Sequence, residues 1–326
     1  MDDILGKNES EIDRELASLN LHNTNSVKNQ DWEHLFDGQK ADSHQEIKYP
    51  IDIPRPETPE LPYNKNAIVR STMGALGDFE YTDAADQLGS KAKSNLSVRQ
   101  LGTSSFQGKL IDNRKEGPGR ILWNNGSTFE GVFIDDLPNG EGRIVHDNGD
   151  FFVGNFIDAR ANGNGKFTSQ FGNVYEGEWV DNVPYGFGEL SNLNGDRYEG
   201  EFVDGQRHGD GRLELPGRGT YEGKFRFGQF HGKGTYFFNN GNVYSGQWDS
   251  GVLHGVGTYM WSDGKKYHGE WMFGKKHGKG KMRWPNGLTY KGEWFEGKQQ
   301  GNGVLYLKNK VVAEGVWVDG NFIDGI

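Results

Sequence analysis

The chain has 326 residues and a formal net charge of −10, and 50 of its residues are glycine. It contains no cysteine, which excludes disulfides, thiolate metal sites and cysteine catalysis, and is typical of a reducing compartment. No apolar run approaches the ~20 residues of a membrane helix, and the acidic start lacks the plan of a signal peptide, so we expect a cytoplasmic protein.

Residues 1–105 are polar, acidic and poor in aromatics, which predicts a mostly disordered acidic arm. Two segments within it have a pattern. Residues 10–21 carry Ile12, Leu16 and Leu19 at helical spacing, so a short helix is expected there on contact with a partner. Residues 50–62 are rich in proline and favour an extended conformation, and Thr58 is a candidate phosphorylation site. The alternative for the whole arm is a solvated tail.

The rest of the chain repeats every 23 residues. Position 0 of the repeat is aromatic in nine successive copies, glycine follows at position 2, and a further aromatic usually stands at position 4. Position 0 is occupied by Phe106, Phe129, Phe152, Tyr175, Tyr198, Tyr221, Tyr244, Tyr267 and Tyr290. A second glycine pair follows at positions 11 and 13, and a turn glycine often stands at position 20. Such a fixed period is the signature of a repeat architecture.

Within one repeat the pattern predicts a β-hairpin. In the copy that begins at Tyr267, large residues and glycines alternate with polar residues, which is the period of a strand with one apolar face. Pro285-Asn286-Gly287 supplies the positive φ values of a tight return. Because in-strand glycine marks close approach to the backbone, we expect the rings to lie over the glycines. The predicted fold is all-β: an elongated single-layer antiparallel sheet of tandem 23-residue hairpins over residues 106–326.

The segment from Tyr267 to Gly280 reads Tyr-x-Gly-x-Trp-x-x-Gly-x-x-His-Gly-x-Gly and resembles the MORN (membrane occupation and recognition nexus) repeat at every named position. The resemblance covers about nine full repeats and a truncated cap. The early repeats depart from the pattern at position 10, where Glu116, Asn139 and Asn162 replace histidine. Residues 215–219 read Leu-Pro-Gly-Arg-Gly where a turn is expected, which predicts a distorted hairpin.

Two sets of side chains are candidate binding residues. Exposed aromatic surface marks interaction sites, and a single-layer sheet is expected to leave part of its aromatic face open. The aromatic candidates for binding a partner protein are Tyr244, Trp248, Trp261, Tyr267, Trp271, Trp284, Tyr290 and Trp294. The lysine candidates for binding an acidic partner or anionic phospholipid are Lys265, Lys266, Lys275, Lys276, Lys279 and Lys281.

Charge is distributed unevenly along the chain. Residues 1–105 carry −7, residues 106–220 carry −8, residues 221–310 carry +8, and the last sixteen residues carry −3. One interpretation is drift on a solvated surface, and the other is an oriented docking surface that steers a partner. Nucleic acid is not an expected partner, because the chain is acidic overall and the aromatics follow the repeat.

No catalytic constellation, metal site or cofactor is expected from the sequence. Four histidines (His208, His231, His254 and His277) recur one per repeat, but equivalent positions lie ~9.6 Å apart in a hairpin array, too far to share a zinc ion. Hydrogen bonding within the hairpin turn is the expected role. The paired glutamates of the strands are expected to form a solvated face.

Two classes of function remain open. Chains that resemble this one include radial spoke head components of cilia and flagella, so the resemblance implies a non-catalytic scaffold that binds cytoskeletal or axonemal proteins. The alternative is a peripheral membrane adaptor that binds anionic phospholipid through the basic repeats, a role in which junctophilins are similar. A homodimer is a further expectation, and enzymatic activity is expected least.

Overall fold

A computed structural model describes residues 65–79, 98–101 and 104–325, and the chain divides into two units. We call the described residues up to Leu193 the N-terminal unit and those from Asn194 the C-terminal unit. The helix expected over residues 10–21, the proline-rich segment 50–62 and Thr58 all lie outside the described residues.

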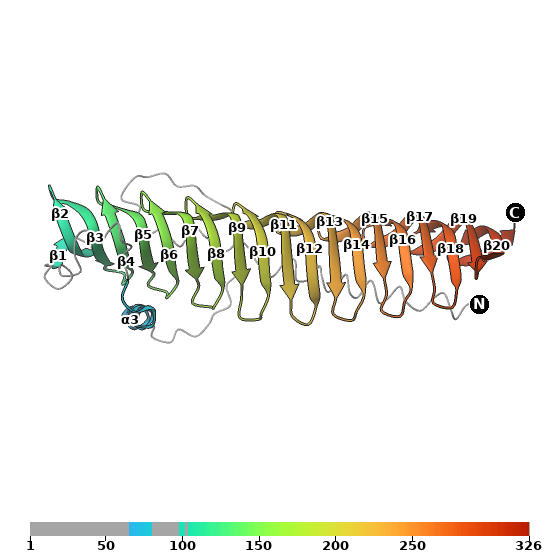
Figure 1. Cartoon of the computed structure of the whole chain (residues 1–326), viewed down its shortest axis with the longest axis horizontal. Coiled ribbons are helices and arrows are strands. Elements are labelled where there is room, and N and C mark those ends of the chain that lie inside the picture. Colours follow the sequence, from blue (N-terminus) through green and yellow to red (C-terminus); the bar gives the residue numbers. More distant parts are fainter. Residues whose placement is uncertain (1–64, 80–97, 102–103, 326) are drawn as a thin grey trace, which may run out of the picture. The chain divides into compact units, whose positions relative to one another are not determined.

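The N-terminal unit has one helix and one antiparallel sheet, in which every strand pairs with the next along the chain (Figure 1). Its elements are α3 (Lys65–Leu76), β1 (Val98–Leu101), β2 (Ser104–Ile111), β3 (Arg114–Trp123), β4 (Thr128–Ile134), β5 (Leu137–Val145), β6 (Phe151–Ile157), β7 (Arg160–Thr168), β8 (Val174–Val180) and β9 (Val183–Ser191). Helix α3 and strand β1 lie within the arm that was expected to be disordered, and neither was predicted.

The C-terminal unit is also a single antiparallel layer with sequential pairing. Its strands are β10 (Arg197–Val203), β11 (Gln206–Leu215), β12 (Gly219–Arg226), β13 (Gln229–Phe238), β14 (Val243–Asp249), β15 (Val252–Met260), β16 (Lys266–Met272), β17 (Lys275–Arg283), β18 (Leu288–Phe295), β19 (Lys298–Leu307), β20 (Lys310–Val318) and β21 (Asn321–Gly325). The all-β, single-layer prediction is confirmed in each unit.

Two kinds of turn close the repeat. Between β16 and β17, Phe273 and Gly274 both have positive φ, at 49° and 81°, as a two-residue type I′ hairpin requires. Between β17 and β18, the Leu288 N–H donates to Asn286 Oδ1 at 3.0 Å, and Gly287 has a φ of 89°. The Pro-Asn-Gly return is therefore confirmed.

The expected distortion at residues 215–219 is wrong. The turn from β11 to β12 is closed by the Arg218 N–H donating to the Leu215 carbonyl at 2.9 Å, the same bond that Gly287 makes to the Trp284 carbonyl in a later repeat. The strands pair without a register shift from Leu215 opposite Gly219 to Gly209 opposite Phe225. The turn keeps the length of the other returns, and the alternation of faces continues through it, because the register is fixed by the hydrophobic pattern of the strands.

The two faces of the sheet differ in character. We call the face that carries the aromatic residues of positions 0 and 4 the ring face, and the opposite face the polar face. On the ring face, a Cβ added to Gly280 would lie 2.6 Å from two ring carbons of Tyr267. Gly269 and Gly280 are directly opposite each other across β16 and β17, under that same ring. The expected packing of rings over glycine backbone is confirmed.

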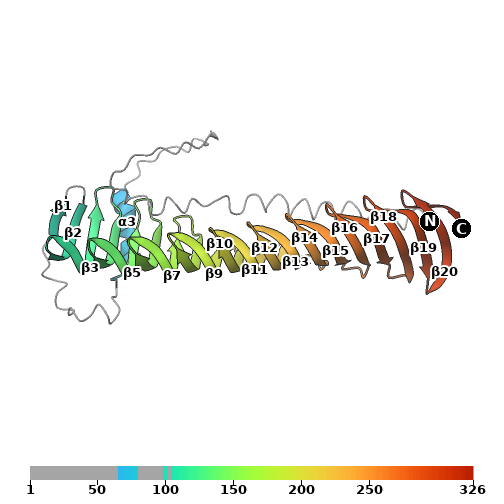
Figure 2. The same cartoon turned by 90° about the horizontal axis from the view of Figure 1, so that it is seen from above.

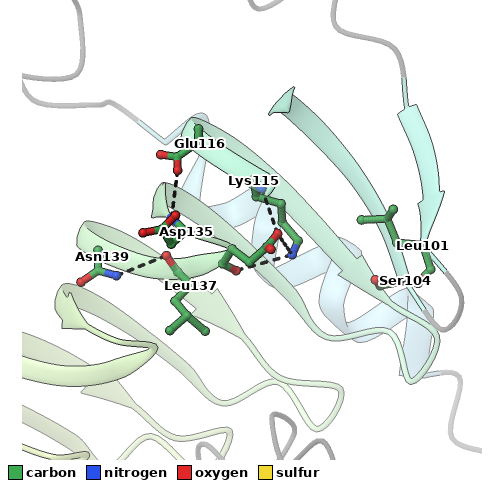
Figure 3. Close-up of polar contacts among 8 residues, drawn as sticks. Leu101, Ser104, Lys115, Glu116, Asp135, Leu137 and Asn139 are labelled. Atoms are coloured by element: carbon green, nitrogen blue, oxygen red, sulfur yellow. Dashed lines mark hydrogen bonds and ion pairs between the residues drawn. The ribbon is translucent and has the colours of Figure 1, made fainter. Parts of the chain in front are cut away.

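Side chains of one repeat also bond the tight turn of the next (Figure 3). The Asp135 N–H donates to Glu116 Oε1 at 3.1 Å, and the Lys115 N–H donates to Asp136 Oδ1 at 2.8 Å. The Asp158 N–H donates to Asn139 Oδ1 at 3.1 Å in the same way. The early repeats that lack histidine at position 10 therefore keep a side chain that links consecutive hairpins.

Candidate functional site

The aromatic candidates form the core of the ring face. Tyr244, Tyr267 and Tyr290 are 0% exposed, and the five tryptophans of the set are 2–9% exposed. The premise that a single-layer sheet leaves these rings open is wrong, because neighbouring rings cover one another. A contact between these residues and a partner stays a prediction, and it would require the rings to move.

Ring-to-ring contacts explain this burial. The Tyr267 ring lies edge-on to Trp271 of its own repeat at 5.1 Å between centroids, and to Trp294 of the next repeat at 5.3 Å. Edge-to-face pairs at such distances are favourable beyond the area they bury. A chain of such pairs therefore links successive repeats on the ring face.

The tyrosine hydroxyls are fixed as well. Tyr267 Oη donates to the Glu270 carbonyl at 2.9 Å, and Tyr244 Oη donates to the Gln247 carbonyl at 2.8 Å. Burial raises the pKa of both hydroxyls above the ordinary value. The hydroxyls therefore stay protonated at neutral pH and serve as hydrogen-bond donors.

Three of the six candidate lysines are engaged within the sheet. Lys265 pairs with Asp263 at 2.9 Å, and Lys275 pairs with Glu296. The Lys276 ammonium lies 4.5 Å from the centroid of the Trp294 ring, at the repeat position that Phe230 and Leu253 occupy elsewhere. Lys265 therefore pairs within its own turn, whereas Lys275 and Lys276 link their hairpin to the next one.

The other three candidates, Lys266, Lys279 and Lys281, point to the polar face. The strand register adds further basic residues to them: Lys266 lies opposite Arg283, and Lys281 lies opposite His268 on β16 and Lys291 on β18. We call Lys266, His268, Lys281, Arg283 and Lys291 the basic patch. Burial, and then the charges of Arg283 and Lys291, lower the pKa of the Lys281 ammonium.

In the N-terminal unit the polar face binds helix α3, which lies against β5 (Figure 2). Arg143 projects from β5 and is 5% exposed. Its Nη2 donates to the Gly77 carbonyl, just after the helix, at 2.7 Å, and also pairs with Glu130 at 2.6 Å. The Arg143 guanidinium further lies 5.7 Å from the Phe79 ring centroid. Sequence reasoning missed this contact, and no pattern local to residues 65–76 indicates it.

The sequence comparison with family models matches the MORN repeat at nine consecutive segments. These segments are 106–128, 129–151, 152–173, 175–197, 198–220, 221–243, 244–266, 267–289 and 290–311. The chain belongs to the MORN-repeat family. A search of the curated proteins found no match.

Solved structures similar to this MORN chain include two TCP domains of CPAP proteins. One is the TCP10 domain of Danio rerio CPAP in complex with a STIL peptide, at 13% identity, covering 65% of this chain and 99% of that chain with a TM-score of 0.35. The other is the Drosophila melanogaster SAS-4 (dCPAP) TCP domain with a proline-rich motif of Ana2, at 14% identity, 53% and 81% coverage and a TM-score of 0.25. Both scores are below 0.5, so neither likeness bears on what this chain binds.

The MORN histidines do not bond within their own turns. His208, His254 and His277 lie against Phe227, Phe273 and Phe295 of the following hairpin, with ring centroids 5.4–6.3 Å apart. The expected role within the turn is therefore replaced by a contact between repeats. No cluster of three or more His, Asp or Glu residues with the geometry of a metal site occurs among the described residues.

The MORN glutamates at position 3 also have a structural task. Glu270 Oε1 accepts the Lys279 N–H at 2.9 Å, and Glu201 Oε1 accepts the Asp210 N–H in the same way. Each contact closes the bulge that follows the second strand's histidine. These carboxylates, expected to be merely solvated, therefore bind the backbone.

Among the described residues, none of the helices combines the length and the apolar composition needed to span a membrane.

Proposed function

We propose that this MORN protein is a non-catalytic scaffold that binds partner proteins along its sheets. The observation that carries the proposal is that the two faces of the sheets differ in composition and in exposure. The aromatic rings that recur every 23 residues are buried in the core of the ring face, whereas the polar face presents side chains that differ from repeat to repeat. Repeats of this kind offer extended binding surfaces.

The finer proposal is a place in a ciliary or other cytoskeletal assembly, such as a radial spoke head, in the cytoplasm. Support comes from the MORN array itself, which the resemblance links to spoke head components. The change in charge, from −8 over residues 106–220 to +8 over residues 221–310, would orient such a partner by complementary charge. A homodimer remains compatible with the same proposal.

The test is purification of the tagged chain from a ciliated cell, combined with its localisation. We expect axonemal structural proteins to copurify at a fixed ratio and the chain to lie along the axoneme. The matched sample carries Glu199→Lys/Glu222→Lys on the polar face, and loss of copurification there supports recognition by that face. Absence of axonemal proteins, or a location away from cilia, would overturn the finer proposal.

A second candidate is a peripheral membrane adaptor, favoured by the cations of the basic patch. Four of its members are lysine or arginine side chains on one face of three adjacent strands, and such clusters are attracted to anionic lipid. Sedimentation with phosphoinositide vesicles at physiological salt tests it. Binding that Lys281→Glu/Lys291→Glu abolishes and Lys233→Glu/Lys310→Glu preserves would support the membrane role, and no sedimentation would exclude it.

A further inference from the structure

The basic patch brings like charges directly opposite each other. Lys281 faces Lys291 across β17 and β18, and Lys266 faces Arg283 across β16 and β17. Like charges in directly opposite positions destabilise a sheet. Among the described residues, no ion pair to these four side chains is found. The Lys291 ammonium lies 5.1 Å from the centroid of the Tyr306 ring, but none of the four like charges faces a paired carboxylate in the described part of the chain.

In some other repeats the same positions carry opposite charges that pair. Arg212, equivalent to Lys281, pairs with Glu222 of the next strand at 2.8 Å. Lys166, also equivalent, pairs with Glu176 at 2.9 Å. Other repeats have uncharged residues there, such as Thr235 opposite Ser245. The basic patch thus differs from the charged pairs Arg212–Glu222 and Lys166–Glu176 in placing two cations opposite each other.

The carboxylates nearest the basic patch are already bonded to backbone. Glu270 of β16 accepts the Lys279 N–H, and Glu293 of β18 accepts the Asn302 N–H at 3.4 Å. Glu296 pairs with Lys275 near the tight turn. Among the described residues, these carboxylates therefore do not pair with the basic patch.

The polar face is also the face on which this chain is seen to bind its own N-terminal part. Helix α3 docks there through the Arg143 guanidinium, which bonds the Gly77 carbonyl. Residues 1–64 directly precede that helix, and they contain fourteen acidic and six basic residues, a net charge of −8. The densest acidic run, Glu9 to Glu15, holds four carboxylates and one arginine.

We propose that the acidic N-terminal segment, residues 1–64, binds the basic patch of the same chain. Sixty-four residues reach up to about 210 Å when extended. The twelve strands of the C-terminal sheet span about 58 Å, so the extended segment is longer than the sheet that carries the basic patch. Attachment to the same chain gives an effective concentration near the millimolar range, which makes weak ionic contacts sufficient. An acidic partner would then have to displace the segment.

The test is cross-linking of the full-length chain with a water-soluble carbodiimide, which couples carboxylates to lysine amines only at contact. Lys266 serves as the reporter because it is retained in every variant. We expect Lys266 to couple to acidic residues of segment 1–64 in wild type, and this coupling to fall several-fold at ~0.5 M salt, where ionic contacts are screened.

Charge reversal within the patch gives the specific result. Lys281→Glu/Lys291→Glu should remove the Lys266 cross-links, whereas Lys233→Glu/Lys310→Glu, with the same change in net charge, should keep them. Adding Glu11→Lys/Glu15→Lys to the first variant should produce new cross-links from these lysines to positions 281 and 291. Circular dichroism confirms that each variant is folded.

A mixture of isotope-labelled and unlabelled chain distinguishes the occupants. Cross-links within one chain support the proposal. Cross-links only between labelled and unlabelled chains would overturn it in favour of a second copy. The proposal is also overturned if no cross-link to segment 1–64 forms, even where phosphoinositide vesicles bind the basic patch. It is overturned as well if Lys281→Glu/Lys291→Glu leaves the Lys266 cross-links unchanged. None of these results depends on the identity of a cytoskeletal partner.

Discussion

The closest packing in the repeat, between a tyrosine ring and the glycine beneath it, makes Gly280→Ala the most informative single change. The added Cβ would lie 2.6 Å from two ring carbons of Tyr267 and closer still to its hydroxyl oxygen. The ring is 0% exposed and its hydroxyl is bonded to the Glu270 carbonyl, so it cannot swing aside freely. Overpacking costs about 1–3 kcal/mol, and the strained hydrogen bond about 1 kcal/mol more. We therefore expect a loss of about 2–4 kcal/mol.

Urea and thermal unfolding followed by circular dichroism measure this loss, and we expect Tm to fall by about 5 °C or more. Two matched substitutions separate its causes. Gly228 has a φ of 78° with nothing within 4 Å of an added Cβ, so Gly228→Ala reports backbone strain alone, about 1–2 kcal/mol. Gly74 lies in α3 with nothing within 4 Å, so Gly74→Ala should be neutral or stabilising by about 1 kcal/mol. If Gly280→Ala costs no more than Gly228→Ala, the ring-over-glycine account is refuted.

Three further predictions concern other parts of the sheets. Phe273 is 72% exposed and has a φ of 49°, a backbone conformation that Asn tolerates better than Phe. Phe273→Asn should therefore raise the free energy of unfolding in urea by about 0.5–1 kcal/mol, and a decrease would contradict the inferred strain. Arg143→Ala removes a buried ion pair and the hydrogen bond to the Gly77 carbonyl after α3, so it should lower the free energy of unfolding by about 3 kcal/mol and speed hydrogen exchange in residues 65–76. The control Arg120→Ala removes an exposed ion pair and should cost under ~0.5 kcal/mol. Equal effects of the two substitutions would contradict the docking role of Arg143. The backbone and side-chain hydrogen bonds from Lys115 lower the pKa of Asp136. The stability that Asp136 contributes is therefore present above the ordinary carboxyl pKa and is lost as pH falls below about 4. Asp136→Asn should flatten that part of a pH–Tm profile, and an unchanged profile would refute the assignment.

Much of the repeat could be predicted from sequence because its determinants are local. Alternation of large and polar residues gives the strands, and Asn286-Gly287 gives the return, since both are set within a few residues of chain. The burial of the rings was not predicted, because it arises between repeats: Tyr267 is covered by Trp294, 27 residues away. A single hairpin considered alone leaves that ring open.

The lysine candidates show a similar limit. A run of lysines indicates positive charge, but it does not indicate which of these side chains contact other residues of the sheet. Lys276 lies on the Trp294 ring, whereas Lys281 shares the polar face with Lys291 of the next repeat. The 23-residue register would have shown the second pairing, had cross-strand neighbours been compared. Docking of α3 depends on the buried Arg143, and no local pattern in residues 65–76 specifies that contact.

The central claim is that the MORN array recognises partner proteins through its polar face. The most direct measurement is photo-cross-linking in a ciliated cell from Val256, which lies on that face, is 51% exposed and is opposite Glu270. The account predicts a covalent adduct with a cytoskeletal protein at Val256, formed in the same cells in which the chain copurifies that protein. Copurification without any adduct at Val256 or at the polar-face residue Phe237, which is 43% exposed, would contradict it.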